Sequence, residues 1–293
     1  MAKAKQKDGF WETLKTIFWA LVIAAAFRTI LFQPFSIPSG SMKPNLLVGD
    51  YLFVSKFAYG YSRYSLPFSP DVGEGRIWAS LPERGDVVVF KHPQRDQCSQ
   101  GPIELVVSLA RRVAGARVPY TNDCTDYVKR VVGLPGDQIQ VSGGVLSING
   151  IPVGMERVAD FVEIKQMRGN PPSAPRCLQP EPSIGGECAK EQWLETLPEG
   201  TSHRVLNLSG TIGQPGTGPR GTDDTSVFTV PDGHLFFMGD NRDNSVDSRK
   251  QNDVGMVPLE NLIGRADVVA FSWDGPIWKV WDWRADRFFK WIE

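Results

Sequence analysis

Ser41 stands in the segment PSGSMKP, residues 38–44, and is the best candidate nucleophile of this 293-residue chain. A serine hydroxyl attacks a carbonyl carbon when a neighbouring base takes its proton, and a lysine can be that base if its surroundings favour the neutral amine. Lys129, in the apolar segment YVKRVVG of residues 127–133, is the candidate base. Together the two residues predict acyl transfer through a serine activated by a lysine.

The apolar neighbours of Lys129 bear on whether it can act as a base. Val128 and Val131 flank it in the sequence. Burial disfavours the charged amine, and lowering a lysine pKa of about 10.4 by roughly three units corresponds to about 4 kcal/mol. An alternating strand would instead turn Lys129 to solvent and Val128 inward, and the sequence leaves this alternative open.

Two further motifs accompany the serine and the lysine. The loop GDNRDNSVDSR, residues 239–249, follows an apolar run and is dense in side chains that could hold a base in place. It does not match an EF-hand calcium loop, which needs alternating acids, a central glycine and a final glutamate. The tripeptide RGD, residues 84–86, precedes the apolar run 87–90 and by itself predicts a turn entering a strand.

In this order the four motifs, with Gly49-Asp50 after the first, resemble those of bacterial type I signal peptidases, also called leader peptidases. That family consists of serine endopeptidases with a Ser-Lys dyad. The resemblance implies that Ser41 is the nucleophile and Lys129 the general base. It implies an oxyanion hole made by the Ser39 hydroxyl and the Ser41 amide.

The same resemblance assigns supporting roles in the polar loop. Ser245 would orient Lys129, while Asp247 and Arg249 would support the site structurally. The implied mechanism needs no metal and no cofactor.

The family cuts signal peptides after small residues, typically in the pattern Ala-x-Ala. Apolar residues next to Ser41 and Lys129 could line shallow pockets that admit alanine and exclude large side chains. These pocket candidates are Phe35, Ile37, Pro38, Tyr127 and Val128. The implied partners are signal peptides of secreted preproteins and membrane lipid. Whether the secretion translocon is a third partner is left open by the resemblance.

An apolar run before the serine predicts a single transmembrane helix over residues 16–33, because its length is close to the roughly 20 residues that span a bilayer. Lysines precede this run at positions 3, 5, 7 and 15. The positive-inside rule then places the N-terminus in the cytoplasm. For a bacterial enzyme, the catalytic domain would lie on the periplasmic side of the inner membrane. A cleaved secretory signal with its small residues at 24–26 is the alternative.

Short apolar or alternating runs between turn signals predict a mainly β, antiparallel fold for the exported part. The predicted strands cover residues 51–54, 87–90, 128–132, 139–141, 145–148, 235–238 and 268–271. Ser142-Gly143-Gly144 predicts a hairpin turn between two of them.

The chain divides into five predicted regions. These are a cytoplasmic N-terminus at 1–15, the transmembrane helix at 16–33, a catalytic β core at 34–142 and 226–274 with an insertion at 95–126, a β-rich but irregular accessory region at 143–225, and an interfacial amphipathic segment at 275–293. Proline, glycine and serine are frequent between Met167 and Gly221, so this stretch is expected to be the irregular part.

The C-terminal segment places Trp281, Arg284 and Phe288 at helical spacing and predicts an interfacial amphipathic helix. A helix packed on the protein's own sheet is the alternative.

Four cysteines fall in the exported part and favour disulfides in an oxidising compartment. Pairing of neighbours along the chain would join Cys98 to Cys124 and Cys177 to Cys188. Unpaired buried thiols remain the alternative.

Three other functions compete with the lysine-activated serine. His92, His203 or His234 could serve as base in a Ser-His-Asp hydrolase. Repressor-type self-cleaving peptidases share the dyad, but they carry a DNA-binding domain where this chain has an apolar helix. An inactive membrane-anchored binding module is the third. The net charge of -1 disfavours a nucleic-acid partner, which normally requires a basic field.

Overall fold

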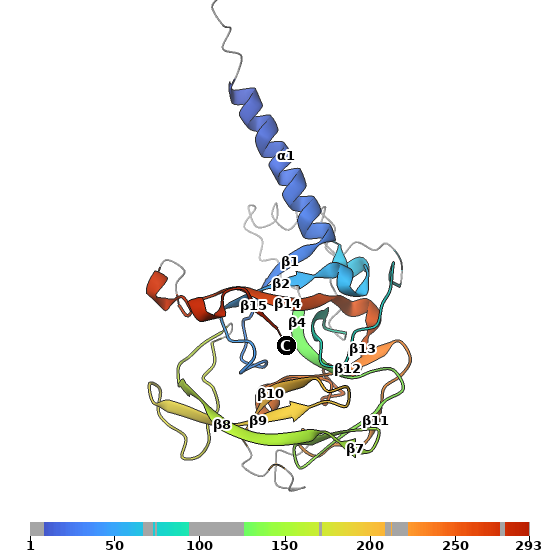
Figure 1. Ribbon diagram of the computed structural model, residues 1–293, viewed down its shortest axis with the longest axis vertical. Coiled ribbons are helices and arrows are strands. Elements are labelled where there is room, and N and C mark those ends of the chain that lie inside the picture. The colour runs from blue at the N-terminus through green and yellow to red at the C-terminus, as the bar shows by residue number, and fades with distance from the viewer. Residues whose placement is uncertain are drawn as a thin grey trace, which may run out of the picture.

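One long N-terminal helix and three β-sheets make up the part of the chain that the computed structural model describes (Figure 1). The described residues are 9–66, 73, 75–93, 126–169, 172–208, 212, 222–275 and 279–292. Neighbouring strands in all three sheets pair antiparallel. The predicted mainly β, antiparallel fold is therefore confirmed.

The helix α1 (Gly9–Ile30) stands out from the β structure at the end where β1 and β2 lie (Figure 1). Its segment Trp11–Ile30 is long and apolar enough to cross a membrane. The helix begins and ends earlier than the predicted 16–33. Its end comes early because residues 32–36 form β1 and pair with β2. Tyr61 Oη donates to the Ile30 carbonyl at 2.6 Å and so satisfies one backbone acceptor at the helix end.

An eight-stranded sheet contains most of the predicted strands. In spatial order it comprises β1 (Phe32–Ser36), β2 (Asp50–Ser55), β14 (Leu262–Ser272), β3 (Val87–Lys91), β4 (Asp126–Gly133), β12 (His234–Met238) and β13 (Val257–Pro258), with β15 (Lys290–Trp291) beside β14. On β3, Val87 and Val89 pack into one hydrophobic cluster, and Val88 and Phe90 pack into another. Because both faces are covered, this strand is an unbroken apolar run in the sequence.

A four-stranded sheet packs against β4 and β12 through a shared apolar cluster. It comprises β5 (Gln138–Ser142), β6 (Val145–Ile148), β7 (Ile151–Pro152) and β11 (Phe228–Thr229). Gly143 and Gly144 connect β5 to β6 with φ of 54° and 75°, as a two-residue hairpin turn requires. All seven predicted strands and this hairpin are confirmed. The division into five regions stays a prediction. β5 was assigned to the catalytic core but pairs within this second sheet, and one domain can contain several sheets.

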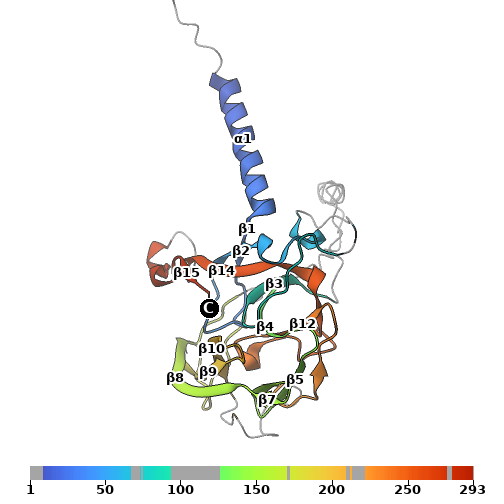
Figure 2. The ribbon, with the colours of Figure 1, turned by 45° about the vertical axis from the view of Figure 1, so that its right-hand side comes forward.

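A three-stranded accessory sheet lies at the end of the molecule away from α1 (Figure 2). It comprises β8 (Gly154–Ile164), β9 (Glu187–Thr196) and β10 (Ser202–Asn207). β9 and β10 fall inside the stretch 167–221, which was expected to be the irregular part of a β-rich accessory region, so this stretch is more regular than expected. β9 buries three polar or charged side chains, Lys190, Gln192 and Glu195, so the strand lacks the apolar alternation that would have predicted it.

Single turns of 3-10 helix connect the sheets. They are η1 (Lys56–Tyr59), η2 (Arg63–Ser65), η3 (Arg242–Asn244), η4 (Leu259–Asn261), η5 (Val280–Asp282) and η6 (Ala285–Arg287). The η3 turn lies inside the predicted polar loop.

The predicted C-terminal amphipathic helix is wrong, because residues 279–292 form η5, η6 and β15. Arg287 points inward, and its NH2 lies 2.5 Å from Asp50 Oδ2. Residues 290 and 291 pair with β14. Tertiary pairing therefore overrides the helical spacing, as it routinely does for short segments.

The predicted disulfide Cys177–Cys188 is confirmed and closes a loop that leads into β9. Cys98 and Cys124 lie outside the described residues, as does nearly all of the predicted insertion.

Candidate active site

The structure brings Ser41 and Lys129 together from segments far apart in the sequence. Ser41 lies in the turns between β1 and β2, and Lys129 lies on β4 opposite Val88 of β3. Lys129 Nζ is 2.7 Å from Ser41 Oγ and 3.0 Å from the Val128 carbonyl oxygen. Both side chains are buried, with Lys129 only 3% exposed. This geometry allows direct proton transfer between the hydroxyl and the amine.

Burial lowers the pKa of Lys129 to about 8. Asp247 and Asp240 oppose this shift, and the charge of Arg249 adds to it. The alternative that alternation turns Lys129 to solvent is wrong, because both faces of the sheet are covered around β4. A lysine with this pKa is neutral in a substantial fraction of molecules just above pH 7.

The backbone around Ser41 is held by Asn241 from the polar loop. Asn241 Nδ2 donates to the Gly40 carbonyl at 2.8 Å, and its amide donates to the Ser41 carbonyl at 3.0 Å. Ser39 Oγ lies 3.4 Å from Ser41 Oγ. Asn241 fell within the predicted loop, but the sequence gave no reason to single it out, since its role depends on the packing of two distant loops.

Asp247 and Arg249 form a buried bidentate pair, with Arg249 Nε and NH2 each 2.9 Å from a carboxylate oxygen. Asp247 also accepts the Gly239 amide at 3.0 Å, and Arg249 NH2 donates to the Arg242 carbonyl at 2.7 Å. Burial raises the pKa of Asp247, but the charge and hydrogen bonds of Arg249 more than offset this and lower it overall. The pair ties the polar loop into one conformation.

Ser245 belongs to the polar loop and, like the Ser41 carbonyl, lies close to Gly239. A side chain at Gly239 would collide with Ser245 Oγ and would approach the Ser41 carbonyl oxygen to 2.7 Å, so glycine permits this close contact. Ser245 Oγ forms no hydrogen bond with Lys129 in the described part of the chain. Its predicted role in orienting the lysine stays a prediction.

All five pocket candidates, together with Ser39, Ser41 and Lys129, line one cleft of about 760 Å³. The lining residues that sequence analysis did not propose include Arg28, Met42, Asp126, Ser173, Asn244 and Val246. Met42 and Asp126 are sequence neighbours of Ser41 and Tyr127, whereas Arg28 comes from α1, Ser173 from the accessory region, and Asn244 and Val246 from the polar loop. Such long-range neighbours could not be deduced from local sequence.

The three histidines have partners other than the candidate serine. His92 Nε2 lies 2.8 Å from Asp253 Oδ1, and His203 Nε2 lies 3.3 Å from Glu195 Oε1. His234 Nδ1 contacts the Asp232 carbonyl. None of these contacts joins a histidine to Ser41, whose hydroxyl contacts Lys129 and Ser39 in the described structure.

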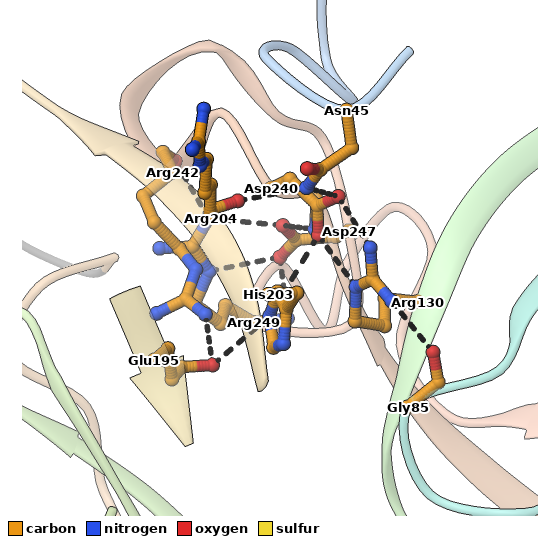
Figure 3. A network of polar contacts seen from close by, with 11 residues as sticks. Asn45, Gly85, Arg130, Glu195, His203, Arg204, Asp240, Arg242, Asp247 and Arg249 are labelled. Carbon is orange, nitrogen blue, oxygen red and sulfur yellow. Dashed lines mark hydrogen bonds and ion pairs between the residues drawn. The ribbon is translucent and has the colours of Figure 1, made fainter. Parts of the chain in front are cut away.

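A buried polar network joins β4 and the polar loop to the accessory sheet (Figure 3). Arg130 forms a bidentate pair with Asp240, both distances being 2.9 Å. Asp240 also accepts Asn45 Nδ2 at 2.6 Å, which reaches back toward the turns that carry Ser41. On the accessory side, Glu195 Oε1 lies 2.5 Å from Arg242 NH2. The network therefore spans from the candidate nucleophile segment to β9.

The chain matches a family described as "Signal peptidase, peptidase S26" over residues 10–271. It is 34% identical over 268 residues to a protein named Signal peptidase I from Rickettsia typhi, covering 88% of this chain and 81% of that one. For the protein of that name from Rickettsia canadensis, the identity is 34% over 274 residues, with 90% and 82% coverage. A crystal structure of a signal peptidase I from Enterococcus faecalis V583 covers 64% of this chain and 97% of that chain at 18% identity, with a TM-score of 0.28.

Proposed function

The chain belongs to the signal peptidase family S26, a family of serine endopeptidases, and from this premise we propose that it is membrane-bound and removes N-terminal signal peptides from exported preproteins. It cleaves after small residues in the pattern Ala-x-Ala, using Ser41 as nucleophile and Lys129 as general base. The observation that carries the proposal is the 2.7 Å contact between Ser41 Oγ and Lys129 Nζ in a buried site.

The reaction is acyl transfer. Neutral Lys129 takes the proton of Ser41 as Oγ attacks the scissile carbonyl carbon, and the Ser39 hydroxyl and Ser41 amide donate hydrogen bonds to the oxyanion. The lysine ammonium then returns its proton to the leaving amine as the peptide bond breaks. Water, deprotonated by neutral Lys129, attacks the acyl-enzyme and releases the signal peptide from Ser41.

The preference for small residues is supported by the walls of the cleft. Phe35, Ile37 and Pro38 lie on one side of Ser41 in sequence, and Tyr127 and Val128 precede Lys129, so apolar side chains surround the reacting atoms. An apolar lining accepts a methyl group with little desolvation cost, which is consistent with alanine next to the cleaved bond.

Membrane attachment of the chain is supported by α1, which fits a membrane anchor. We place the N-terminus in the cytoplasm and the β domain on the periplasmic side of the bacterial inner membrane, because lysines precede the helix. Tethering raises the effective concentration of the site at the membrane, where signal peptides present their cleavage point. Exposed Trp281, Phe289 and Trp291 suit contact with lipid headgroups, and the translocon is a further proposed partner.

The test is cleavage of a purified preprotein with an Ala-x-Ala site by the full-length protein in detergent. Ser41→Ala and Lys129→Ala should each lower the rate by at least about 10³-fold, because removing a member of such a catalytic unit leaves only residual catalysis. Lys290→Ala, which changes an exposed lysine on β15, is the matched control and should cleave like wild type. Circular dichroism checks that each variant is folded.

Two outcomes would contradict the proposal. Retained cleavage by folded Ser41→Ala or Lys129→Ala would remove that residue from the mechanism. Absence of cleavage by the wild-type protein would favour the binding-module alternative.

A further inference from the structure

A buried triad of charged side chains links the accessory sheet to the turn that carries Ser41. Lys43 Nζ lies 2.5 Å from Glu163 Oε2, and Lys190 Nζ lies 3.5 Å from Glu163 Oε1. The side chains of Lys43, Glu163 and Lys190 are 6%, 11% and 1% exposed. Charges held this far from water are kept only with good partners, since a buried ion without one costs several kcal/mol.

Lys43 reaches the triad by passing directly over the residue before the nucleophile. A Cβ atom at Gly40 would lie only 3.3 Å from Lys43 Cε and 3.5 Å from Lys43 Cδ, so the lysine stem packs across this glycine. The Lys43 amide also donates to the Gly40 carbonyl at 3.3 Å. The position of the ammonium group thus constrains the backbone that presents the Ser41 amide.

Glu163 is itself fixed by the accessory sheet. It lies on β8 opposite Cys188 of β9, and Cys188 is bonded to Cys177. Lys190 projects from the same strand two residues after Cys188. The carboxylate is therefore presented from a paired strand, whose neighbour β9 is joined by the disulfide to the loop before it, rather than from a free loop.

We propose that Glu163 is a positioning residue for catalysis, which acts through Lys43 to hold the turn that carries Ser41 and the oxyanion hole. This inference rests on the proposed peptidase function. Glu163 from the accessory sheet then holds the turn together with Asn241 from the polar loop. The accessory sheet is thereby part of the catalytic apparatus, although it contributes no atom to the reaction.

Loss of the contact between Lys43 and Glu163 should weaken stabilisation of the transition state rather than binding of the substrate. Small displacements of an oxyanion donor weaken the interaction with the developing charge, and a shift of about 1 Å can cost about 10²-fold in rate. Phe35 on β1, and Tyr127 and Val128 on β4, form cleft walls that do not contact Glu163 in the described structure. Loss of the contact should therefore lower kcat and leave KM nearly unchanged.

The experiment measures kcat and KM for preprotein cleavage by full-length wild type, Glu163→Gln, Lys43→Met and Lys43→Arg. We expect kcat to fall about 10–100-fold for Glu163→Gln and for Lys43→Met, with KM within about twofold of wild type. Lys43→Arg keeps the ion pair and should stay within about threefold in kcat. The double variant should lose no more than the single variants, because both remove one interaction.

Glu181→Gln is the matched control, since Glu181 pairs at 2.8 Å with Lys165, two residues beyond Glu163. It should cleave like wild type. Lys43→Met leaves the Glu163–Lys190 pair intact, so this variant tests the proposal even if Glu163→Gln does not fold.

The outcomes separate the two hypotheses. Wild-type kcat in folded Lys43→Met or Glu163→Gln would overturn the positioning role, as would a loss confined to KM or equal losses in Lys43→Arg and Lys43→Met. If wild type cleaves and Ser41→Ala does not, such a result leaves the peptidase function standing. Absence of wild-type cleavage would instead overturn the proposed function.

Discussion

Two regions of the molecule bury lysines beside different kinds of partner, uncharged oxygens in one region and a carboxylate in the other. In the eight-stranded sheet and the turn beside it, Lys129 and Lys56 contact hydroxyl or carbonyl oxygens, and burial lowers the pKa of each to about 8. In the accessory sheet, Lys190 shares Glu163 with Lys43; burial lowers the pKa of Lys190 as well, but Glu163 opposes that shift. A buried lysine with uncharged partners readily gives up its proton, whereas one beside a carboxylate serves to hold structure.

Breaking a charged contact of the accessory sheet should have the largest effect on stability. Burial raises the pKa of Glu195, but Arg242 and His203 more than offset this and lower it overall. Glu195→Gln leaves Arg242 buried without its carboxylate, and we expect a loss of about 3–5 kcal/mol in the free energy of unfolding. Chemical denaturation measures it.

The control for this prediction is Glu199→Gln. Glu199 pairs with Arg84, but its side chain is 50% exposed, so the loss should stay below about 1 kcal/mol. Equal losses in the two variants would contradict the distinction between buried and exposed pairs.

The two regions also differ in how well the sequence predicted them. Five strands of the eight-stranded sheet, β2, β3, β4, β12 and β14, followed from apolar runs such as residues 87–90, where both faces are covered by apolar side chains. β9 was missed since it buries Lys190 and Glu195, and buried charges are recognisable only once their partners are known.

The same contrast holds within the candidate site. The positions of Ser41 and Lys129 followed from four motifs, and the structure places the two side chains in contact. The roles of Asn241 and Glu163 could not be predicted, because each acts on the turn from a loop or strand more than a hundred residues away. The prediction of a C-terminal helix was wrong for a related reason, since Arg287 pairs with the buried Asp50 from a distant part of the chain.

Removing a lysine that lacks a charged partner should have an intermediate effect of opposite sign. Lys129→Met leaves no counter-ion unpaired and relieves the cost of burying an amine whose pKa falls from 10.5 to about 8. We expect the free energy of unfolding at pH 7 to rise by about 1–3 kcal/mol.

The pH dependence of stability sharpens this prediction. Because the folded-state pKa of Lys129 lies below its unfolded value, the folded protein binds fewer protons between pH 8 and 10.5. Wild-type stability therefore gains a rising contribution through this window, and Lys129→Met should lack it. A variant less stable than wild type at pH 7 would show that the lysine contributes more through its contacts than its burial costs.

The pH dependence of cleavage is the smallest expected effect. It tests most directly which buried lysine acts as the base. Only neutral Lys129 can accept the proton of Ser41, so kcat/KM should fall about tenfold for each pH unit below about 8 and level off above it. Lys56 has a similar pKa, but its amine contacts the Ser65 and Arg28 carbonyls and not Ser41. Lys56→Met should therefore keep the same midpoint. A midpoint that moves in Lys56→Met would show that the titration belongs to Lys56. A flat profile from pH 6 to 9 would contradict a base with a pKa of about 8, because such an amine changes from mostly charged to mostly neutral within this range.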